Sequence, residues 1–164
     1  MKVNIALLTV TDTRTFDNDK SGAILVDKIK EANHVLFDRK ICKDNKNEIV
    51  LILKEWINKD DIDVVITTGG TGLTGRDITP EAIEEIADKH IPGFGEIFRM
   101  LSYKKIKTST IQSRACAGIS NGKYLFSLPG SPSACKDAWD KIIKYQLDSS
   151  FKPCNLVEIL PKLN

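Results

Sequence analysis

The stretch "IDVVITTGGTGLTGRDITPEAIEEI", residues 62–86, joins two elements of different periodicity through a glycine-rich loop. Residues 62–68 form an almost unbroken apolar and β-branched run, which is typical of a strand buried on both faces of a parallel sheet. Thr79 and Pro80 favour a helix with the threonine as N-cap and the proline in the first helical position. The stretch therefore predicts a strand–loop–helix unit.

The same alternation of strand and helix patterns continues along the 164-residue chain. We expect strands at residues 3–10, 34–42, 62–68, 109–119 and 123–129, and helices at 23–32, 45–58, 79–90, 92–106 and 130–146. The alternation predicts an α/β fold: three α/β/α layers with a mostly parallel mixed sheet. We expect one domain over residues 1–164, in which residues 151–164 are a tail that packs on the domain or on a neighbouring subunit.

Local signals fix several of these boundaries. Asn45 and Glu48 have the spacing of a capping box at the start of the second expected helix. Asn121-Gly122 lies between two expected strands and predicts a tight hairpin turn, so at least one pairing in the sheet is antiparallel. Ser131 followed by Pro132 predicts the N-cap of the last long helix.

The composition narrows the classes of partner. With 24 basic and 22 acidic residues, the net charge of +2 is too small for a nucleic-acid-binding surface. No run approaches the roughly 20 apolar residues that cross a bilayer. The four cysteines have no zinc-site spacing, so we expect reduced thiols and a cytoplasmic protein. We expect no nucleic-acid or membrane partner.

The glycine loop invites comparison with two known phosphate-binding motifs. Gly70, Gly72 and Gly75 fit the dinucleotide pattern G-x-G-x-x-G, but that pattern belongs in the first strand-to-helix turn, with the helix starting among the glycines. Here the loop follows the third expected strand, and the helix cannot start before Thr79. The Walker A motif is also excluded, because no Lys-Ser or Lys-Thr pair follows the glycines.

The remaining interpretation is a longer anion-binding loop. Small residues let successive backbone N–H groups turn toward one point and hold an anion, and Thr68 and Thr71 add hydroxyl donors. The helix that starts at Thr79 adds a partial positive charge. Asp77 would repel a phosphate unless a cation such as Mg²⁺ lies between them. The loop therefore indicates metal-assisted phosphate chemistry; the alternative is a plain turn in which Asp77 caps the helix.

Polar residues also follow the other expected strands. Thr11 and Asp12 end the first strand, Asp44 follows the second, and residues 129–133 lead into the last long helix. Each has an ordinary explanation as a turn former or helix cap, and Ser131 is at least as well explained as an N-cap as by a ligand contact. Their shared position at strand ends predicts that they lie on one rim with the glycine loop.

These motifs together resemble one known family. The segments "ALLTVTDTR" (6–14), "TTGGTGLTGRDITPEA" (67–82), "LPGSPSACKDAW" (128–139) and "QLDSSFKPCNLVEI" (146–159) resemble the MoaB/MogA family of molybdenum cofactor biosynthesis proteins, and the MoaB branch more than MogA. The resemblance covers nearly the whole chain. It implies a molybdopterin-binding domain that adenylylates molybdopterin with Mg-ATP, giving molybdopterin–AMP and pyrophosphate, and a homo-oligomer (a trimer or a hexamer).

The resemblance also implies roles for single residues. Asp77 matches the family's essential aspartate and Asp44 its second acidic position, so both are expected to be catalytic and to hold Mg²⁺. The other expected substrate- and nucleotide-binding residues are Thr11, Asp12, Thr68, Gly69, Gly70, Thr71, Gly72, Thr79, Pro129, Gly130, Ser131 and Ser133.

Three alternatives to the adenylyltransferase stay open at the level of the sequence. The first is a non-catalytic binder of molybdopterin or nucleotide with a storage or hand-over role. The second is a hydrolase of a nucleotide pyrophosphate, although related domains of that kind are fused to a further domain. The third is an oligomeric scaffold, for which the apolar tail is the only indication.

Overall fold

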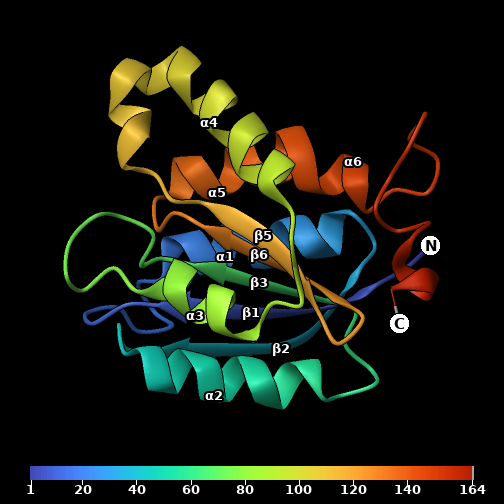
Figure 1. Cartoon of the computed structure of the whole chain (residues 1–164), viewed down its shortest axis with the longest axis horizontal. Coiled ribbons are helices and arrows are strands. Elements are labelled where there is room, and N and C mark those ends of the chain that lie inside the picture. Colours follow the sequence, from blue (N-terminus) through green and yellow to red (C-terminus); the bar gives the residue numbers. More distant parts are fainter. Residues whose placement is uncertain (164) are drawn as a thin grey trace.

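The structure, a computed structural model, describes residues 1–163 and forms one sheet between two layers of helices (Figure 1). The six strands lie in the order β2-β1-β3-β6-β5-β4. β2, β1, β3 and β6 are parallel, and β5 pairs antiparallel with both β6 and β4. The strands are β1 (Asn4–Val10), β2 (Val35–Cys42), β3 (Val64–Thr68), β4 (Lys89–His90), β5 (Cys116–Ser120) and β6 (Lys123–Leu128). The predicted α/β/α fold with a mixed sheet is confirmed.

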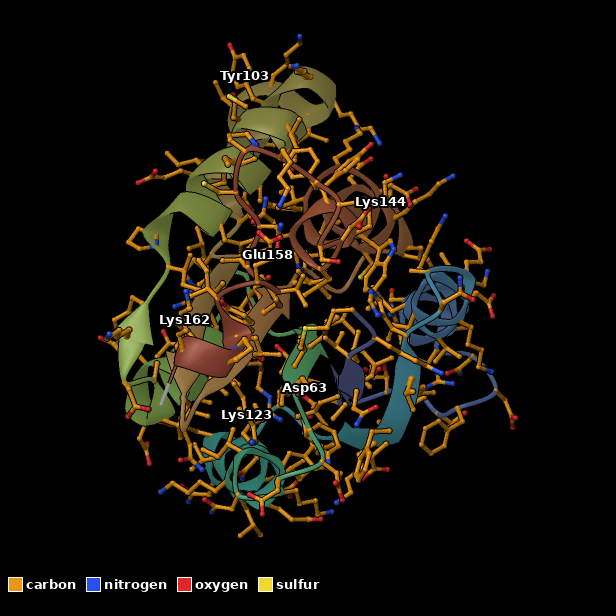
Figure 2. All side chains as sticks on the ribbon, turned by 90° about the vertical axis from the view of Figure 1, so that its right-hand side faces the viewer. Asp63, Tyr103, Lys123, Lys144, Glu158 and Lys162 are labelled. Carbon is orange, nitrogen blue, oxygen red and sulfur yellow. The ribbon has the colours of Figure 1, made fainter. Side chains whose placement is uncertain are left out.

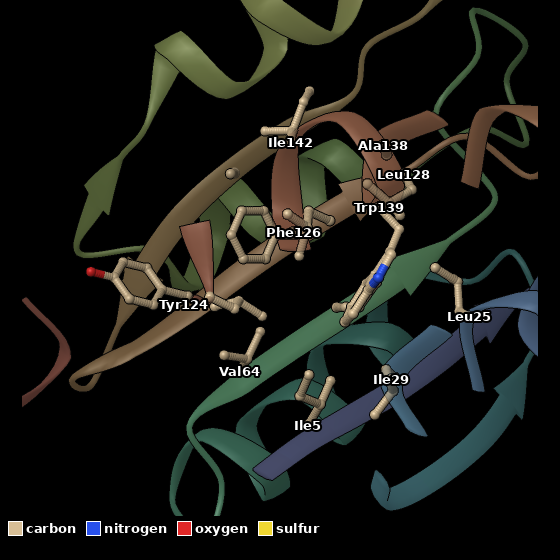
Figure 3. Packing of buried hydrophobic residues seen from close by; sticks show 14 of the residues in the cluster. Ile5, Leu25, Ile29, Val64, Tyr124, Phe126, Leu128, Ala138, Trp139 and Ile142 are labelled. Carbon is tan, nitrogen blue, oxygen red and sulfur yellow. The ribbon is translucent and has the colours of Figure 1, made fainter. Parts of the chain in front are cut away.

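One face of the sheet is covered by α1 (Lys20–Glu31), α4 (Pro92–Ile106) and α5 (Pro132–Ala138). α5 continues through a π-helical turn, η2 (Trp139–Ile143), into α6 (Lys144–Gln146). Figure 3 shows Trp139 packed between β1, β3 and α1, with Ile5, Val64 and Ile29 around it. These apolar side chains are at most 1% exposed, and they belong to the larger of the two cores that the structure describes.

The opposite face is covered by α2 (Lys46–Ile57) and α3 (Thr79–Ile86). Successive side chains of a strand point to opposite faces, so Ala6 and Leu8 of β1 pack against α2 whereas Ile5 and Leu7 pack against α1. Because β1 and β3 are buried on both sides, they read in the sequence as unbroken apolar runs.

Of the caps and turns predicted from local sequence signals, the structure forms two helix caps and the hairpin turn in full and the capping box in part. Asn45 caps α2, since its side chain accepts a hydrogen bond from Glu48 N at 3.1 Å, and Ser131 caps α5 in the same way through Ala134 N at 3.2 Å. Asn121 and Gly122 take φ of 46° and 72° in the turn between β5 and β6. The capping box is half formed, because the Glu48 carboxylate accepts from Lys43 N rather than from Asn45 N.

Thr79 is not the N-cap of α3, which corrects the prediction. Ile78 occupies that position, and the Thr79 hydroxyl instead donates to the carbonyl oxygen of Gly69 at 2.8 Å. A tertiary partner, invisible in the local sequence, has taken over the side chain that usually caps the helix.

Two segments between α3 and β5 differ from the predicted pattern. α3 ends at Ile86, and Lys89–His90 form the two-residue strand β4, which is too short for periodicity to detect. The strand expected over residues 109–119 begins only at Cys116, because Lys107–Gln112 form a 3₁₀ helix, η1. The side chains of η1 contribute no buried residue, so the segment lacks the buried face that a strand needs.

The last residues pack on the domain at the edge opposite the carboxyl ends of the parallel strands. Val157 and Leu160 join the larger core, and Tyr124 Oη donates to Leu156 O at 2.8 Å. A short 3₁₀ helix, η3 (Leu160–Lys162), follows, and Figure 2 shows Glu158 and Lys162 on this face. Asn164, the last residue of the predicted tail, lies outside the described residues.

Within residues 1–163, every helix falls short of the length and apolar character that a bilayer crossing requires. The longest helix that the structure describes, α4, has Phe94, Gly95 and Phe98 as its buried residues and carries Tyr103 at its outer end, away from the sheet (Figure 2).

The helix α2 offers a matched test of the smaller core. Leu53 is 0% exposed and Leu51 is 72% exposed on the same helix. We expect Leu53→Ala to lower the free energy of unfolding by about 2–5 kcal/mol, because it removes buried methyl groups and leaves a cavity. Leu51→Ala should change it by less than about 0.5 kcal/mol. Urea unfolding followed by tryptophan fluorescence measures both; equal effects would contradict this assignment of the core.

Candidate functional site

A pocket of about 720 Å³ lies at the carboxyl ends of the central strands. Its walls are the loops that follow β1, β3 and β6, together with one face of α4 and η1. β1, β3 and β6 are neighbours in the sheet, so the loops that follow them meet at one edge, on the left of Figure 1. Ligands of open α/β sheets bind in this position.

Most of the predicted site residues line this pocket, although their roles stay predictions. Two do not: Ser133 is exposed and outside the lining, and Thr79 is buried behind the glycine loop. Those that line it are Thr11, Asp12, Asp44, Thr68, Gly69, Gly70, Thr71, Gly72, Asp77, Pro129, Gly130 and Ser131.

The first turn of the glycine loop requires glycine for steric reasons. Gly69 and Gly70 have φ of 103° and 69°, which L-residues with a side chain rarely adopt. A Cβ on Gly69 would collide with the carbonyl oxygen of Val10, and one on Gly70 would lie 3.1 Å from Asp44 Oδ1 and clash with the Thr79 hydroxyl. The glycine loop is therefore packed against Val10 at the end of β1 and against Asp44 and Thr79.

Two backbone N–H groups of this turn, those of Gly70 and Thr71, are available to a ligand. Gly69 N donates to Leu128 O at 2.9 Å. Among residues 1–163, Gly70 N and Thr71 N have no such acceptor, although Thr71 is only 4% exposed. Buried N–H groups rarely stay unpaired in native proteins. Unpaired N–H groups beside a positive-φ turn of this kind are suited to binding an anion.

Asp77 closes the outer half of the loop. Its Oδ2 accepts hydrogen bonds from the backbone N and the hydroxyl of Thr74, at 2.9 Å and 2.6 Å. A Cβ on Gly72 would lie 2.8 Å from the same oxygen, so the carboxylate lies directly against the loop. Partial burial alone would raise the pKa of Asp77, but these hydrogen bonds outweigh it and lower the pKa. Asp77 is therefore held in its charged form.

Arg114 braces the loop from behind. Its Nε donates to Gly72 O at 2.7 Å and its Nη2 to Asp77 O at 2.8 Å, while Nη1 pairs with Glu81. The backbone N of Arg114 also donates to Thr71 O at 3.0 Å. The guanidinium of Arg114 therefore holds the glycine loop in shape.

Acidic groups converge at the mouth of the pocket. Asp12 forms a two-pronged ion pair with Arg76, in which Nε donates to Oδ2 at 2.9 Å and Nη2 to Oδ1 at 2.8 Å. These hydrogen bonds lower the pKa of Asp12. Asp44 has no such partner among the described residues, and its burial together with the charges of Asp12 and Asp77 raises its pKa. The charged form of Asp44 is therefore unfavourable in this pocket, and a bound cation would stabilise it.

The donor set fits a magnesium ion that is completed by its ligand. No group of three or more His, Cys, Asp or Glu side chains within residues 1–163 is arranged to hold a metal by itself. Mg²⁺ in phosphate-transfer sites often has one or two carboxylate ligands, with substrate phosphates and water as the rest. Asp44 and Asp77 both line the pocket, and Asp44 is under the like-charge repulsion that a cation would relieve.

The second loop packs against the first through backbone. A Cβ on Gly130 would lie 3.3 Å from Gly69 Cα, and the Thr68 hydroxyl donates to Pro129 O at 2.9 Å. Gly130 O is in turn an acceptor for Ser21 Oγ at 2.6 Å and for Arg14 Nη1 at 3.1 Å. The loops after β1, β3 and β6 therefore form one connected unit.

The sequence reasoning missed the residues that fix the loop after β1. Asp19 caps α1 through Gly22 N, accepts from the Thr9 hydroxyl at 2.6 Å and pairs with Arg39 at 2.9 Å. Burial alone would raise the pKa of Asp19, but the Thr9, Gly22 and Arg39 hydrogen bonds lower it. A cap signal was present in the sequence, since Asp19 precedes the helical pattern. Arg14 had no local signal.

The fold and the pocket define a class, the α/β proteins that bind a ligand at the carboxyl ends of their central strands. Residues 6–149 match the family described as "Probable molybdopterin binding domain". Molybdenum cofactor biosynthesis protein B of Escherichia coli strain K12 is 48% identical over 158 residues, which cover 96% of this chain and 93% of that protein.

Solved structures agree with the sequence match. A crystal structure of molybdenum cofactor biosynthesis protein B superposes with a TM-score of 0.90 at 41% identity, over 99% of this chain and 96% of that one. The tungsten cofactor synthesizing protein MoaB from Pyrococcus furiosus gives 0.83 at 36% identity, over 99% and 97% of the two chains. The chain belongs to this molybdopterin-binding domain family of molybdenum cofactor biosynthesis proteins, in its MoaB branch.

The two aspartates should affect stability in opposite directions. A raised pKa costs folding free energy above that pKa and nothing below the unfolded value, so Asp44→Asn should stabilise the protein at about pH 8 and lose this effect by about pH 3. A lowered pKa contributes stability above the unfolded value that is lost as pH falls through the folded pKa. Asp77→Asn should therefore destabilise at about pH 8, with a smaller effect in acid.

Thermal unfolding midpoints of both variants across this pH range test the expectation, with the native protein measured beside them. Shifts of the same sign for the two variants at neutral and alkaline pH would show that the charges at the pocket mouth are arranged differently.

Proposed function

We propose that this protein binds molybdopterin and adenylylates it with Mg-ATP, producing molybdopterin–AMP and pyrophosphate. The observation that carries the proposal is that Gly70 N and Thr71 N, which have no acceptor among residues 1–163, belong to residues that line the same pocket as Asp44 and Asp77. A site with donors for one anion and carboxylates for a cation is suited to a reaction that joins two phosphate groups.

The two ends of the pocket differ in chemistry. The end at the strand loops carries the charged groups, whereas Phe98, Ser102, Gln112 and Ser113 on α4, η1 and the residue after it supply an apolar wall and neutral polar groups. A pterin ring has apolar faces and an edge of hydrogen-bond donors and acceptors, so the neutral end suits it. The phosphate of molybdopterin then reaches toward the glycine loop.

The residues of the chain have separate tasks in this proposal. The N–H groups of Gly70 and Thr71 and the hydroxyl of Thr71 hold the terminal phosphate of molybdopterin, and Arg114 keeps the loop in the shape that this requires. Asp44 and Asp77 would hold Mg²⁺ with the phosphates of ATP. The bound ion would neutralise charge on the triphosphate and stabilise the leaving pyrophosphate. No side chain of the pocket acts as a covalent nucleophile here.

A non-catalytic binder is the second candidate, and one observation favours it. Asp12 is already engaged by Arg76, and no third acidic ligand joins Asp44 and Asp77 among the described residues. A protein that only stores or hands over molybdopterin needs the glycine loop but not the cation. Release of pyrophosphate from purified protein, Mg-ATP and molybdopterin separates the two functions, because a passive binder releases none.

Replacement of Asp77 by alanine should slow pyrophosphate release by about 100-fold or more, since it removes charge stabilisation at the reacting phosphates. Binding of molybdopterin should change by less than about tenfold, because the loop amides remain. The matched control is Asp60→Ala, an exposed carboxylate in the segment that enters β3, at the opposite end of that strand. A native rate for Asp77→Ala would refute this mechanism.

Several expectations from the sequence remain predictions. They are the trimeric or hexameric assembly, the cytoplasmic location, the absence of a nucleic-acid partner, and the extent of the single domain over residues 1–164.

A further inference from the structure

We propose that Arg14 binds a phosphate group of a ligand directly, beside the loop of Pro129–Ser131, and does so without a divalent cation. The proposal rests on the proposed function in taking the pocket as a phosphate site. It adds a second anion subsite on the side of α1 and α5, whereas Asp44 and Asp77 precede α2 and α3 on the other face of the sheet. The sequence reasoning assigned no role to this residue.

The first argument is the charge inventory of the pocket. The ionised side chains that line it are Asp12, Arg14, Asp44 and Asp77. Asp12 is neutralised by Arg76, with a contact of 2.7 Å. Arg14 forms no ion pair with any carboxylate of residues 1–163, so it is the one cation in the lining that is free to pair with an incoming anion.

The other arginines of the described chain are engaged elsewhere. Arg39 pairs with Asp19, Arg76 with Asp12 and Arg114 with Glu81. Arg99 donates to the carbonyl oxygens of Ser113 and Ala115. A phosphate that enters the pocket therefore meets Arg14 without having to break an existing ion pair.

The second argument is that, in the described part of the chain, the Arg14 guanidinium is held through only one of its nitrogens, Nη1. Nη1 donates to Gly130 O at 3.1 Å and to Ser21 Oγ at 3.3 Å, and the backbone N donates to Thr11 Oγ1 at 3.2 Å. A guanidinium has five N–H donors. Nε and Nη2 have no acceptor among residues 1–163, and they form the face of the fork that matches two phosphate oxygens.

The bracing lowers the cost of binding. Ser21 Oγ donates to Gly130 O at 2.6 Å, so the three groups form a closed triangle between the loop after β1, the start of α1 and the loop after β6. A long side chain that is already ordered loses less conformational entropy when its ligand arrives. The permanently charged guanidinium then fixes the anion at this end of the pocket.

The separation of charges gives the ligand an orientation. The carboxylates Asp44 and Asp77 repel an anion that carries no cation, and their loops lead into α2 and α3 on one face of the sheet. Arg14 and Gly130 lie on the side of α1 and α5. One phosphate can therefore bind at Arg14 on its own, while a metal-bound phosphate occupies the acidic side.

Two sources can supply the phosphate, ATP or molybdopterin, so the test uses both as separate probes. Binding is measured by calorimetry on protein dialysed against about 1 mM EDTA, which removes divalent cations and prevents turnover. Arg14→Gln should weaken binding of at least one probe by about tenfold or more, the usual loss for a hydrogen bond to a charged group. The probe that is affected identifies the phosphate source.

The control for charge is Arg76→Gln, which removes the same charge from the partner of Asp12 and leaves Arg14 in place. If net charge alone governed binding, the two variants would lose affinity equally; we expect Arg14→Gln to lose at least about fivefold more. Arg14→Lys keeps the charge but not the fork and should fall between native and Arg14→Gln. The loss should shrink as salt is added, because the contact is partly exposed.

Arg14 also holds Gly130, so folding must be checked for each variant through its thermal unfolding midpoint. Ser21→Ala removes one brace and leaves the fork intact, and it should cost less affinity than Arg14→Gln. Binding of both probes within about twofold of native by a folded Arg14→Gln, or equal losses for Arg14→Gln and Arg76→Gln, would overturn the proposal. Because the assay needs no turnover, absence of adenylylation leaves this test unaffected.

Discussion

The loops after β1, β3 and β6 approach one another so closely that their backbones are in direct contact. Gly69 turns with a φ of 103° directly against the carbonyl oxygen of Val10, and Gly130 approaches Gly69 Cα so closely that an added Cβ would lie 3.3 Å away. A side chain at Gly69 would clash with the backbone, and one at Gly130 would be tightly packed against it. The loops after β1, β3 and β6 are therefore locked to one another, and the pocket inherits its shape from this contact rather than from its lining side chains.

Arginine side chains add further hydrogen bonds that hold these loops together. Arg114 holds the carbonyl groups of Gly72 and Asp77, and Arg76 joins the glycine loop to Asp12 on the loop after β1. Arg39 fixes Asp19 at the start of α1. Loops are usually the mobile parts of a fold, but here each is tied to a neighbour by a charge-assisted hydrogen bond. A rigid rim is what a site needs when it acts by positioning its ligands.

The same rim contains a conflict between stability and function. Asp44 is half-buried near two other carboxylates, and its raised pKa shows that the fold tolerates the charge at a cost. Asp77 lies within the same pocket but is stabilised by Thr74, so its pKa is lowered. A bound cation would offset the like-charge repulsion on Asp44, while Asp77 would keep its hydrogen bonds to Thr74. Sites that hold ligands commonly retain charges that the empty protein would be more stable without.

The sequence by itself determined several features whose cause is local. The apolar runs of β1 and β3 fixed the parallel sheet, Asn45 and Ser131 fixed two helix starts, and Asn121-Gly122 fixed the hairpin. These depend on side-chain periodicity or on contacts within a few residues. The glycine loop was also recognisable, since only glycine accepts its backbone angles.

Only the tertiary structure decided which charged groups meet. Asp12 and Arg76 are 64 positions apart, and Arg14 and Gly130 are 116 apart, so no spacing rule links them. The hydroxyl of Thr79 left its expected capping position for Gly69 O, and Ser133 turned away from the pocket that its neighbour Ser131 lines. Long-range partners are chosen by where the sheet places the loops, because a charge pairs with whatever the fold brings near it.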